Sequence, residues 1–224
     1  MSNPWLSIPL KDYEGHMSSP GVQQLTALAE LFKRALDYCV PGSVAVLGVA
    51  GGNGLEQINC EATKRIVGVD INQRYLNEVD RRFGSGRLAG LELYCRDLAE
   101  GDLSIPPVAL VHAALIFEHA GLGLALEHAL YLVAPGGRFS VVLQAPSKHE
   151  EGVTPTGYTS MQTLKKDFAL IDWEEFQCLL REKGFELVEQ EDWPLPGGKA
   201  LWLGVFAQSR NAPFGVWGGV RFSF

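Results

Sequence analysis

Short apolar runs alternate with segments of helical periodicity along most of the chain. The runs at 44–49 and 65–70 are continuous and rich in β-branched residues, which is typical of strands buried on both faces of a parallel sheet. Two further runs near the carboxyl end flank a Pro/Gly-rich loop and are expected to form a hairpin. The predicted strands are 44–49, 65–70, 91–95, 108–117, 138–144, 185–191 and 200–207.

Helices are predicted in the intervals between most of these strands. Ser19 and Pro20 are expected to begin the first helix, because serine caps helix N-termini and proline is tolerated in the first turn. A short helix is expected after the first strand, and a longer one over about 121–133. Two further helices are expected to begin at the capping residues Asn72 and Asp172.

Alternating strands and helices require a parallel sheet that is covered by helices on both faces. The predicted fold is therefore α/β: a doubly wound, mostly parallel seven-stranded sheet with a C-terminal antiparallel hairpin. No linker or internal repeat divides residues 1–224, so a single domain is expected. Its parts are an N-terminal arm and helix (1–43), a core (44–207) that includes an irregular excursion (145–170), and a tail (208–224).

The composition is that of a globular domain, and the net charge limits the classes of partner that the protein would attract. The chain is 46% hydrophobic and 20% charged, which excludes disorder as its main state. Its net charge of −7 provides no general attraction to nucleic acid or anionic lipid. The four cysteines include no C-x-x-C pair, and no apolar stretch approaches the ~18 residues that span a bilayer. Because no basic and apolar leader opens the chain, we expect a cytoplasmic protein.

The first predicted strand runs into a turn with four glycines between residues 48 and 54. Ligands of open α/β sheets bind where such turns gather, at the carboxyl ends of the strands, and glycine lets the backbone approach them closely. No register of this turn meets the G-x-G-x-x-G spacing of dinucleotide sites. The small residues alternate instead, which favours a smaller ligand without a pyrophosphate; they are Gly48, Ala50, Gly52 and Gly54.

Acidic residues follow the next two strands. Asp70 ends the second strand, 22 residues after Gly48, where a carboxylate can accept hydrogen bonds from both hydroxyls of a ribose. Asp97 follows the third strand and can accept from an adenine amino group, with the Leu98 N–H facing the ring. Either acid alone could equally be a solvated loop residue or a helix cap. Their joint position after a glycine-rich turn favours a nucleoside ligand.

In these segments the sequence resembles the class I S-adenosylmethionine-dependent methyltransferases. The similarity covers residues 44–144 through the segments VLGVAGGNG, VGVDIN, CRDL, ALIFEH and LVAPGGRF, and the hairpin extends it to about 207. The resemblance implies a Rossmann-like fold and S-adenosylmethionine as cofactor, with S-adenosylhomocysteine as product. It also implies that the glycine turn contacts the methionine part, Asp70 the ribose and Asp97 the adenine, and that Ile71 packs on the adenine.

Two positions depart from that family. An acid usually stands where this chain has Gly48, and a glycine where it has Ala50. The cofactor ammonium would therefore lack one partner, for which Glu56 is a candidate. The missing acid also supports the alternative that the protein binds the cofactor without methylating anything.

Further candidates lie on either side of this core. Members of the family often lay an N-terminal segment over the cofactor, which makes Tyr13 and Met17 candidate contacts, unless they only pack the arm. Glu118 and His119 follow the fourth strand, where acceptors approach the methyl donor. A neutral imidazole there could take a proton from a hydroxyl or an amine. The plainer interpretation is a helix-capping acid and a partly exposed histidine.

The excursion at 145–170 is predicted to be a substrate lid, because it leaves the fifth strand at the same edge as the glycine turn and the two acids. Its candidate contacts are His149, Tyr158 and Met161, among the loop residues Gly152, Pro155 and Gly157. His112, inside the fourth strand, is expected to be a core histidine. The five histidines show no metal-ligand spacing, so no metal is expected.

The leading functional prediction is transfer of a methyl group from S-adenosylmethionine to a small molecule. The acidic chain favours a small acceptor over a polymer, as does the absence of an Asn/Asp-Pro-Pro-aromatic run after the fourth strand. Methyl transfer needs positioning and a dry pocket more than side-chain chemistry, so no catalytic residue is assigned. The alternatives are methylation of protein or nucleic acid and a non-methylating S-adenosylmethionine-binding module.

Overall fold

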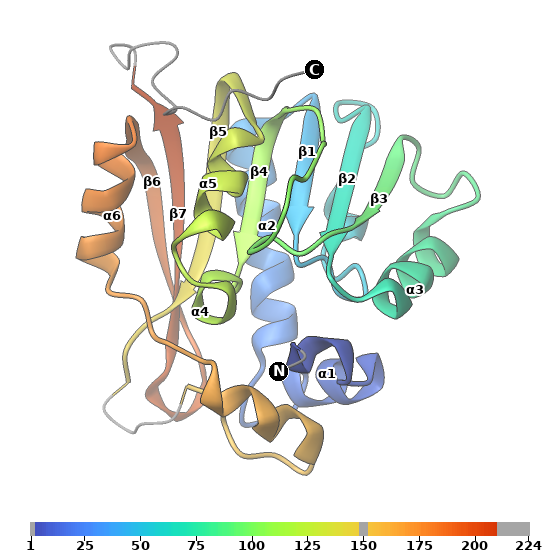
Figure 1. Ribbon diagram of the computed structural model, residues 1–224, viewed down its shortest axis with the longest axis vertical. Helices are drawn as coiled ribbons and strands as arrows, with labels where there is room; N and C mark the ends of the chain where they lie inside the picture. Colours follow the sequence, from blue (N-terminus) through green and yellow to red (C-terminus); the bar gives the residue numbers. More distant parts are fainter. Residues whose placement is uncertain (1–2, 148–151, 210–224) are drawn as a thin grey trace.

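A mixed sheet of seven strands runs through the computed structural model, which describes residues 3–147 and 152–209 (Figure 1). The strand order is β3-β2-β1-β4-β5-β7-β6. All seven predicted strands are confirmed; their observed bounds are β1 Ser43–Leu47, β2 Arg65–Asp70, β3 Leu91–Cys95, β4 Val108–Ala114, β5 Val133–Gln144, β6 Phe185–Pro194 and β7 Ala200–Gln208.

Strand β7 runs in the direction opposite to that of the other strands in this sheet. Strands β1 to β5 pair in parallel, and β7 is antiparallel to both β5 and β6. The predicted mostly parallel sheet with a C-terminal antiparallel hairpin is therefore confirmed. From β1 the chain proceeds outward through β2 to β3, and then returns to the other side of β1 with β4. This reversal makes a topological switch point between the carboxyl ends of β1 and β4, which is where open α/β sheets bind ligands.

Helices cover both faces of the sheet, as the alternation predicts. Side chains of α2 and α3 pack on one face, in an apolar cluster with β1 and β2. Side chains of α5 and α6 pack on the other face, in a larger cluster with β4 and β5. The observed helices are α1 Leu10–Met17, α2 Gln24–Cys39, α3 Gln73–Phe83, α4 Phe117–Ala120, α5 Leu124–Tyr131 and α6 Trp173–Glu182. Short 3-10 segments are η1 Pro4–Leu6, η2 Leu55–Gln57, η3 Thr159–Lys166 and η4 Pro196–Gly198.

Two predicted caps are confirmed and one helix start is wrong. The Asn72 side chain accepts a hydrogen bond from Arg74 N, and Asp172 accepts one from Glu175 N. Ser19 does not begin α2: the N–H groups of Val22 and Gln23 donate to its carbonyl, which makes a separate turn. Gln23 then adopts a left-handed φ of 51°, and α2 begins only at the next residue.

The region after β4 also departs from the predicted pattern. The strand ends at Ala114, because Leu115 has a left-handed φ of 53°, and α4 begins at Phe117. The single helix predicted over 121–133 is replaced by α4 and α5. Strand β5 begins at Val133 instead of 138, since the glycines that were expected to end a helix lie within the strand at a register shift against β4. After β1, the expected short helix is the 3-10 turn η2.

Candidate functional site

The loops that follow β1, β2, β4 and β5 gather at one edge of the sheet, and α1 and η3 lie side by side across it (Figure 1). This carboxyl edge holds the glycine turn, Asp70 and the start of α4. Most of the residues predicted for the site are therefore brought to one place.

The glycine turn (residues 48–54) has a backbone that only small residues accept easily. Gly48, Ala50, Gly52 and Gly54 all have positive φ, at 68°, 46°, 86° and 88°. Their α-carbons lie against other parts of the protein: a Cβ at Gly52 would be 2.6 Å from Phe83 Cε2, and one at Gly54 would be 3.0 Å from Phe32 Cδ1. At Gly48 a Cβ would collide with Ile116, whose side chain occupies the space beside that position. Packing alone thus explains three of the four small residues.

Asp70 connects the glycine turn to the start of α3. Its Oδ2 accepts a hydrogen bond from Ala50 N at 2.9 Å, and its Oδ1 accepts one from Asn72 N at 2.8 Å. Only 8% of the residue is exposed. Burial raises the pKa of this carboxyl to about 6, against the opposing effect of the backbone hydrogen bonds. A buried carboxylate with free lone pairs is a strong acceptor for ligand hydroxyls.

The other residues predicted for the nucleoside lie next to Asp70. Asp70 pairs with Cys95 in the β2–β3 register, which brings the segment after β3 beside Ile71. Asp97 is partly exposed, and its Oδ1 accepts from Ala99 N at 2.8 Å. Leu98 is buried in the larger apolar cluster.

An N-terminal segment (residues 3–17) lies over this edge. The carbonyl of Trp5 accepts from Asn72 Nδ2 at 2.9 Å, and the carbonyl of Ile8 accepts from the Tyr75 hydroxyl at 2.9 Å. Tyr13 packs beside Tyr75, and its pKa is raised by burial and by the negative charge of Asp70. The predicted arm contact Tyr13 therefore reaches the site.

Met17 takes a different place from Tyr13. It packs with α2 and with the β6–β7 hairpin, in a cluster that includes Leu31 and Leu201. The structure does not bring this residue to Asp70 or to the glycine turn.

The acids near the glycine turn all have partners. Glu14 pairs with Arg82, whose Nη1 also donates to the carbonyl of Gly51 at 3.0 Å. Glu56 accepts from Gly54 N at 3.1 Å, so the suggested substitute for the missing acid caps the turn. A pocket of about 370 Å³ lies between α1 and the glycine turn. Its lining includes Glu14, Gly52, Asn53, Glu56 and Arg82.

Residues 152–168 close over the same edge and contact the N-terminal segment. The Ser160 hydroxyl donates to Asp12 Oδ2 at 2.7 Å, and His16 Nδ1 lies 2.9 Å from Thr156 Oγ1. Tyr158 lies directly on Gly15, and Met161 is buried with Ile8. We call residues 3–17 and 152–168 together the cover. The predicted lid contact His149 lies outside the described residues.

Glu118 and His119 occupy the short helix α4, beneath the cover. Glu118 is 1% exposed; its Oε1 accepts from Gln144 N at 2.8 Å, and burial raises its pKa to about 7. The His119 ring lies edge-on to Trp5 and Phe168, with centroids 5.1 and 5.3 Å away, and burial lowers its pKa to about 4. The plainer interpretation is therefore wrong for the acid, which is buried and caps no helix, but it agrees with the structure for His119, which is partly exposed.

Three residues, His112, Trp5 and Phe168, show what could and could not be predicted from the sequence. His112 is buried with its Nδ1 3.0 Å from Ser140 Oγ, which agrees with a core histidine. Trp5 and Phe168 were not predicted, because both lie in segments without apolar periodicity. Proximity in the fold alone brings them to His119.

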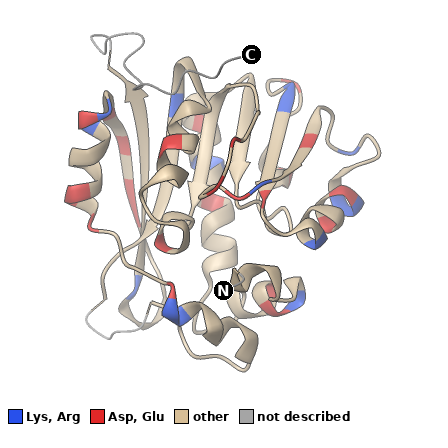
Figure 2. Ribbon diagram, viewed as in Figure 1, with Lys and Arg blue, Asp and Glu red and all other residues tan. Residues whose placement is uncertain are grey.

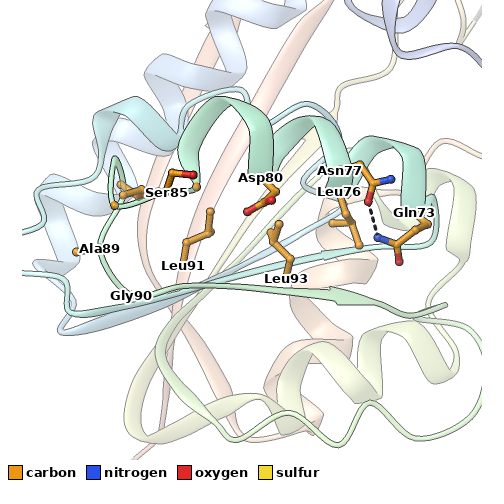
Figure 3. A pocket seen from close by; sticks show the side chains of 12 residues that line it. Gln73, Leu76, Asn77, Asp80, Ser85, Ala89, Gly90, Leu91 and Leu93 are labelled. Carbon is orange, nitrogen blue, oxygen red and sulfur yellow. Dashed lines mark hydrogen bonds between the residues drawn. The ribbon is translucent and has the colours of Figure 1, made fainter.

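A larger groove lies away from this edge. It has a volume of about 490 Å³ and runs between α3 and the edge strand β3 (Figure 3). Its apolar floor includes Leu91 and Leu93, and its rim carries Gln73, which donates to Asn77 at 2.9 Å. Asp80 is its single titratable lining residue. The carboxyl edge offers more chemistry and is the better candidate site.

Charges on the described part of the chain are mixed. Figure 2 shows acidic and basic residues interspersed over the helices.

Within residues 3–147 and 152–209, no group of three or more His, Cys, Asp or Glu side chains could hold a metal ion. No helix among those residues has both the length and the apolar character to cross a membrane.

Comparison with solved structures identifies the fold. No protein-family model matches the chain, and a search of curated proteins finds no match. The N-methyltransferase NodS from Bradyrhizobium japonicum, in complex with S-adenosylhomocysteine, has a TM-score of 0.64 at 14% identity, over 92% of this chain and 99% of that one. Magnesium protoporphyrin IX methyltransferase (ChlM) from Synechocystis with bound S-adenosylmethionine has a TM-score of 0.63 at 13% identity, over 93% and 98%.

The chain has the fold of the class I S-adenosylmethionine-dependent methyltransferases. The [4+2]-cyclase SpnF is also similar, with a TM-score of 0.64 at 12% identity, over 82% of each chain. The fold is thus shared by enzymes of more than one reaction type, and it does not by itself define the reaction.

Proposed function

We propose that this protein binds S-adenosylmethionine at the carboxyl edge of its sheet and transfers the methyl group to a small molecule. The observation that carries the proposal is the position of Asp70. It ends β2 beside the switch point and is held by N–H groups of the glycine turn and of the start of α3. On this fold, such a carboxylate is placed to accept from the two ribose hydroxyls.

The residues present fit the adenosine part of the cofactor. Asp70 is buried and keeps lone pairs for a ligand, Ile71 directly follows it, and Asp97 lies after the neighbouring strand β3. The methionine part would extend along the glycine turn, towards the pocket beside Gly52 and Asn53. Its ammonium would have to be received mainly by backbone carbonyls, because Glu14 and Glu56 already have partners.

The bound sulfonium would supply an already activated methyl group. The protein therefore has two tasks: to position the acceptor against the methyl donor, and to exclude water from the site. The cover performs the second task in this proposal. Its two segments hold each other through Asp12 and Ser160 and through His16 and Thr156, and they place Trp5 and Phe168 against the ring of His119. The cover therefore has to open for ligands to enter and to close before transfer.

A covered site supports a small acceptor. Glu118 is buried, and the rings of Trp5 and Phe168 lie against His119, which favours an acceptor small enough to enter beneath the cover over a folded protein or a duplex. The mixed charge distribution in Figure 2 also offers little attraction to a polyanion.

One observation favours the alternative of a non-methylating module. Ile116 fills the space beside Gly48, the position where the methyltransferases usually carry an acid. Titration calorimetry with S-adenosylmethionine and S-adenosylhomocysteine tests binding, and NAD serves as a control ligand. Binding of both with no release of S-adenosylhomocysteine in any acceptor mixture would favour the module, and no binding of either would contradict the proposal.

A further inference from the structure

Two consecutive residues of α4 have buried polar atoms without a partner. Glu118 Oε2 and His119 Nδ1 make no hydrogen bond in the part of the chain that the structure describes, and a third such atom there, Gln162 Nε2, belongs to the cover. Leaving a buried polar group unpaired is costly, because the group has lost its hydrogen bonds to water. Native structures rarely retain such groups without a reason, and a ligand is one such reason.

Helix α4, which carries both residues, adjoins the edge of the sheet to which the proposed function assigns the cofactor. Helix α4 follows β4 at the switch point, and Ile116, directly before it, contacts Gly48 of the glycine turn. The amide of Ala169 donates to the carbonyl of Glu118 at 2.8 Å, which ties α4 to the segment after the cover. The site therefore joins the cofactor edge on one side and the cover on the other.

The chemistry of the two groups defines what they can bind. A bound cation favours the ionised form of Glu118, which only accepts hydrogen bonds, and an imidazole nitrogen that carries no proton does the same. Burial keeps His119 neutral at pH 7, and the aromatic rings of Trp5 and Phe168 stand beside it. A hydroxyl or phenol has one proton to donate, whereas a protonated primary amine has three and is also attracted by aromatic faces.

We infer, on the basis of the proposed function, that the methyl acceptor is a primary amine held as its ammonium ion by Glu118 and His119. The ammonium gives one proton to the Glu118 carboxylate, at the unpartnered Oε2. The freed nitrogen lone pair then forms the bond to the methyl carbon while the carbon–sulfur bond breaks and its electron pair stays on sulfur. The products are a secondary ammonium, a protonated and neutral Glu118, and S-adenosylhomocysteine without the sulfonium charge, so atoms and charge balance.

Calorimetry on the protein saturated with S-adenosylhomocysteine tests this inference without needing turnover. The probe is 2-phenylethylamine, and 2-phenylethanol is its neutral analogue of the same shape. We expect the amine to bind at least about tenfold more tightly than the alcohol. Glu118→Gln keeps the oxygen that accepts from Gln144 N but replaces an acceptor with a donor, so it should abolish that preference. Glu174→Gln, at an exposed position on α6, is the matched control and should retain it.

Three results would overturn the inference. They are equal binding of amine and alcohol, absence of amine binding, and an unchanged preference in Glu118→Gln. In each case intact binding of S-adenosylhomocysteine would leave the proposed function standing. Failure of the wild-type protein to bind S-adenosylhomocysteine would instead contradict the proposed function itself.

Discussion

At the scale of single residues, the site depends on small residues and on acids whose partners are backbone groups. Asp70 accepts from two N–H groups, and Ala50, one of the donors, has a left-handed φ of 46° that an alanine adopts only when its surroundings enforce it. The acid and the turn were both visible in the sequence. The hydrogen bond that joins them was not, because it spans 20 residues.

The role of Gly52 can be tested at this scale. Gly52→Ala should lower the melting temperature, because φ is 86° there and the new Cβ would lie 2.6 Å from Phe83 Cε2. We expect a loss of about 1–3 kcal/mol, with part of it recovered in the double variant Gly52→Ala/Phe83→Leu. Additive losses would show that Phe83 is not the group that requires the glycine.

Glu118 should make stability depend on pH. Its pKa is about 7 in the folded protein and 4.5 as the ordinary value, so the folded state binds its proton more tightly. This favourable contribution is complete below pH 4.5 and is lost as the pH rises through 7. Glu118→Gln should therefore be more stable than wild type at pH 8 and equal to it near pH 4.5. The difference at pH 8 should be of the order of 3 kcal/mol. Urea unfolding at both pH values measures it, and a pH-independent difference would contradict the assignment.

At the scale of elements, strands were more predictable than helices. β2 and β3 have the predicted bounds. For β2 the reason is its continuous apolar run, which is buried. β3 is a half-buried edge strand, and its apolar residues Leu91 and Leu93 alternate with Glu92. Helix α1 was missed because its sequence, LKDYEGHM, has too few apolar residues to show a periodicity. Contacts with distant residues stabilise it, among them the pairs Tyr13–Tyr75 and Glu14–Arg82.

The cover is the element whose movement the proposed function requires. Trypsin can cleave after Lys165 and Lys166 of η3 when the cover opens. We expect saturating S-adenosylhomocysteine to slow cleavage at these sites several-fold, because a ligand beneath the cover shifts it towards the closed state. Arg181 lies in α6, outside the cover, so cleavage after it is the internal control. Equal rates with and without ligand would contradict a lid.

At the scale of the whole molecule, the alternation of strands and helices was enough to predict the sheet and the edge that holds the site. It could not predict how closely that edge is covered. Residues 3–17 and 152–168 lie far apart in the sequence and meet through side-chain pairs such as Asp12 and Ser160. Such contacts depend on the completed fold, so no local pattern reports them.

The binding of S-adenosylhomocysteine to Asp70 variants tests the central claim most directly. Asp70→Ala removes two hydrogen bonds to a charged group, each worth ~1.5–3 kcal/mol, so affinity should fall by about a hundredfold or more. Asp70→Asn, which keeps one acceptor, provides a second test if the alanine variant fails to fold. Asp37→Asn, at an exposed position on α2, should bind like wild type. We predict weak or absent binding in a folded Asp70 variant. An unchanged dissociation constant in that variant would contradict the assignment of this edge as the cofactor site.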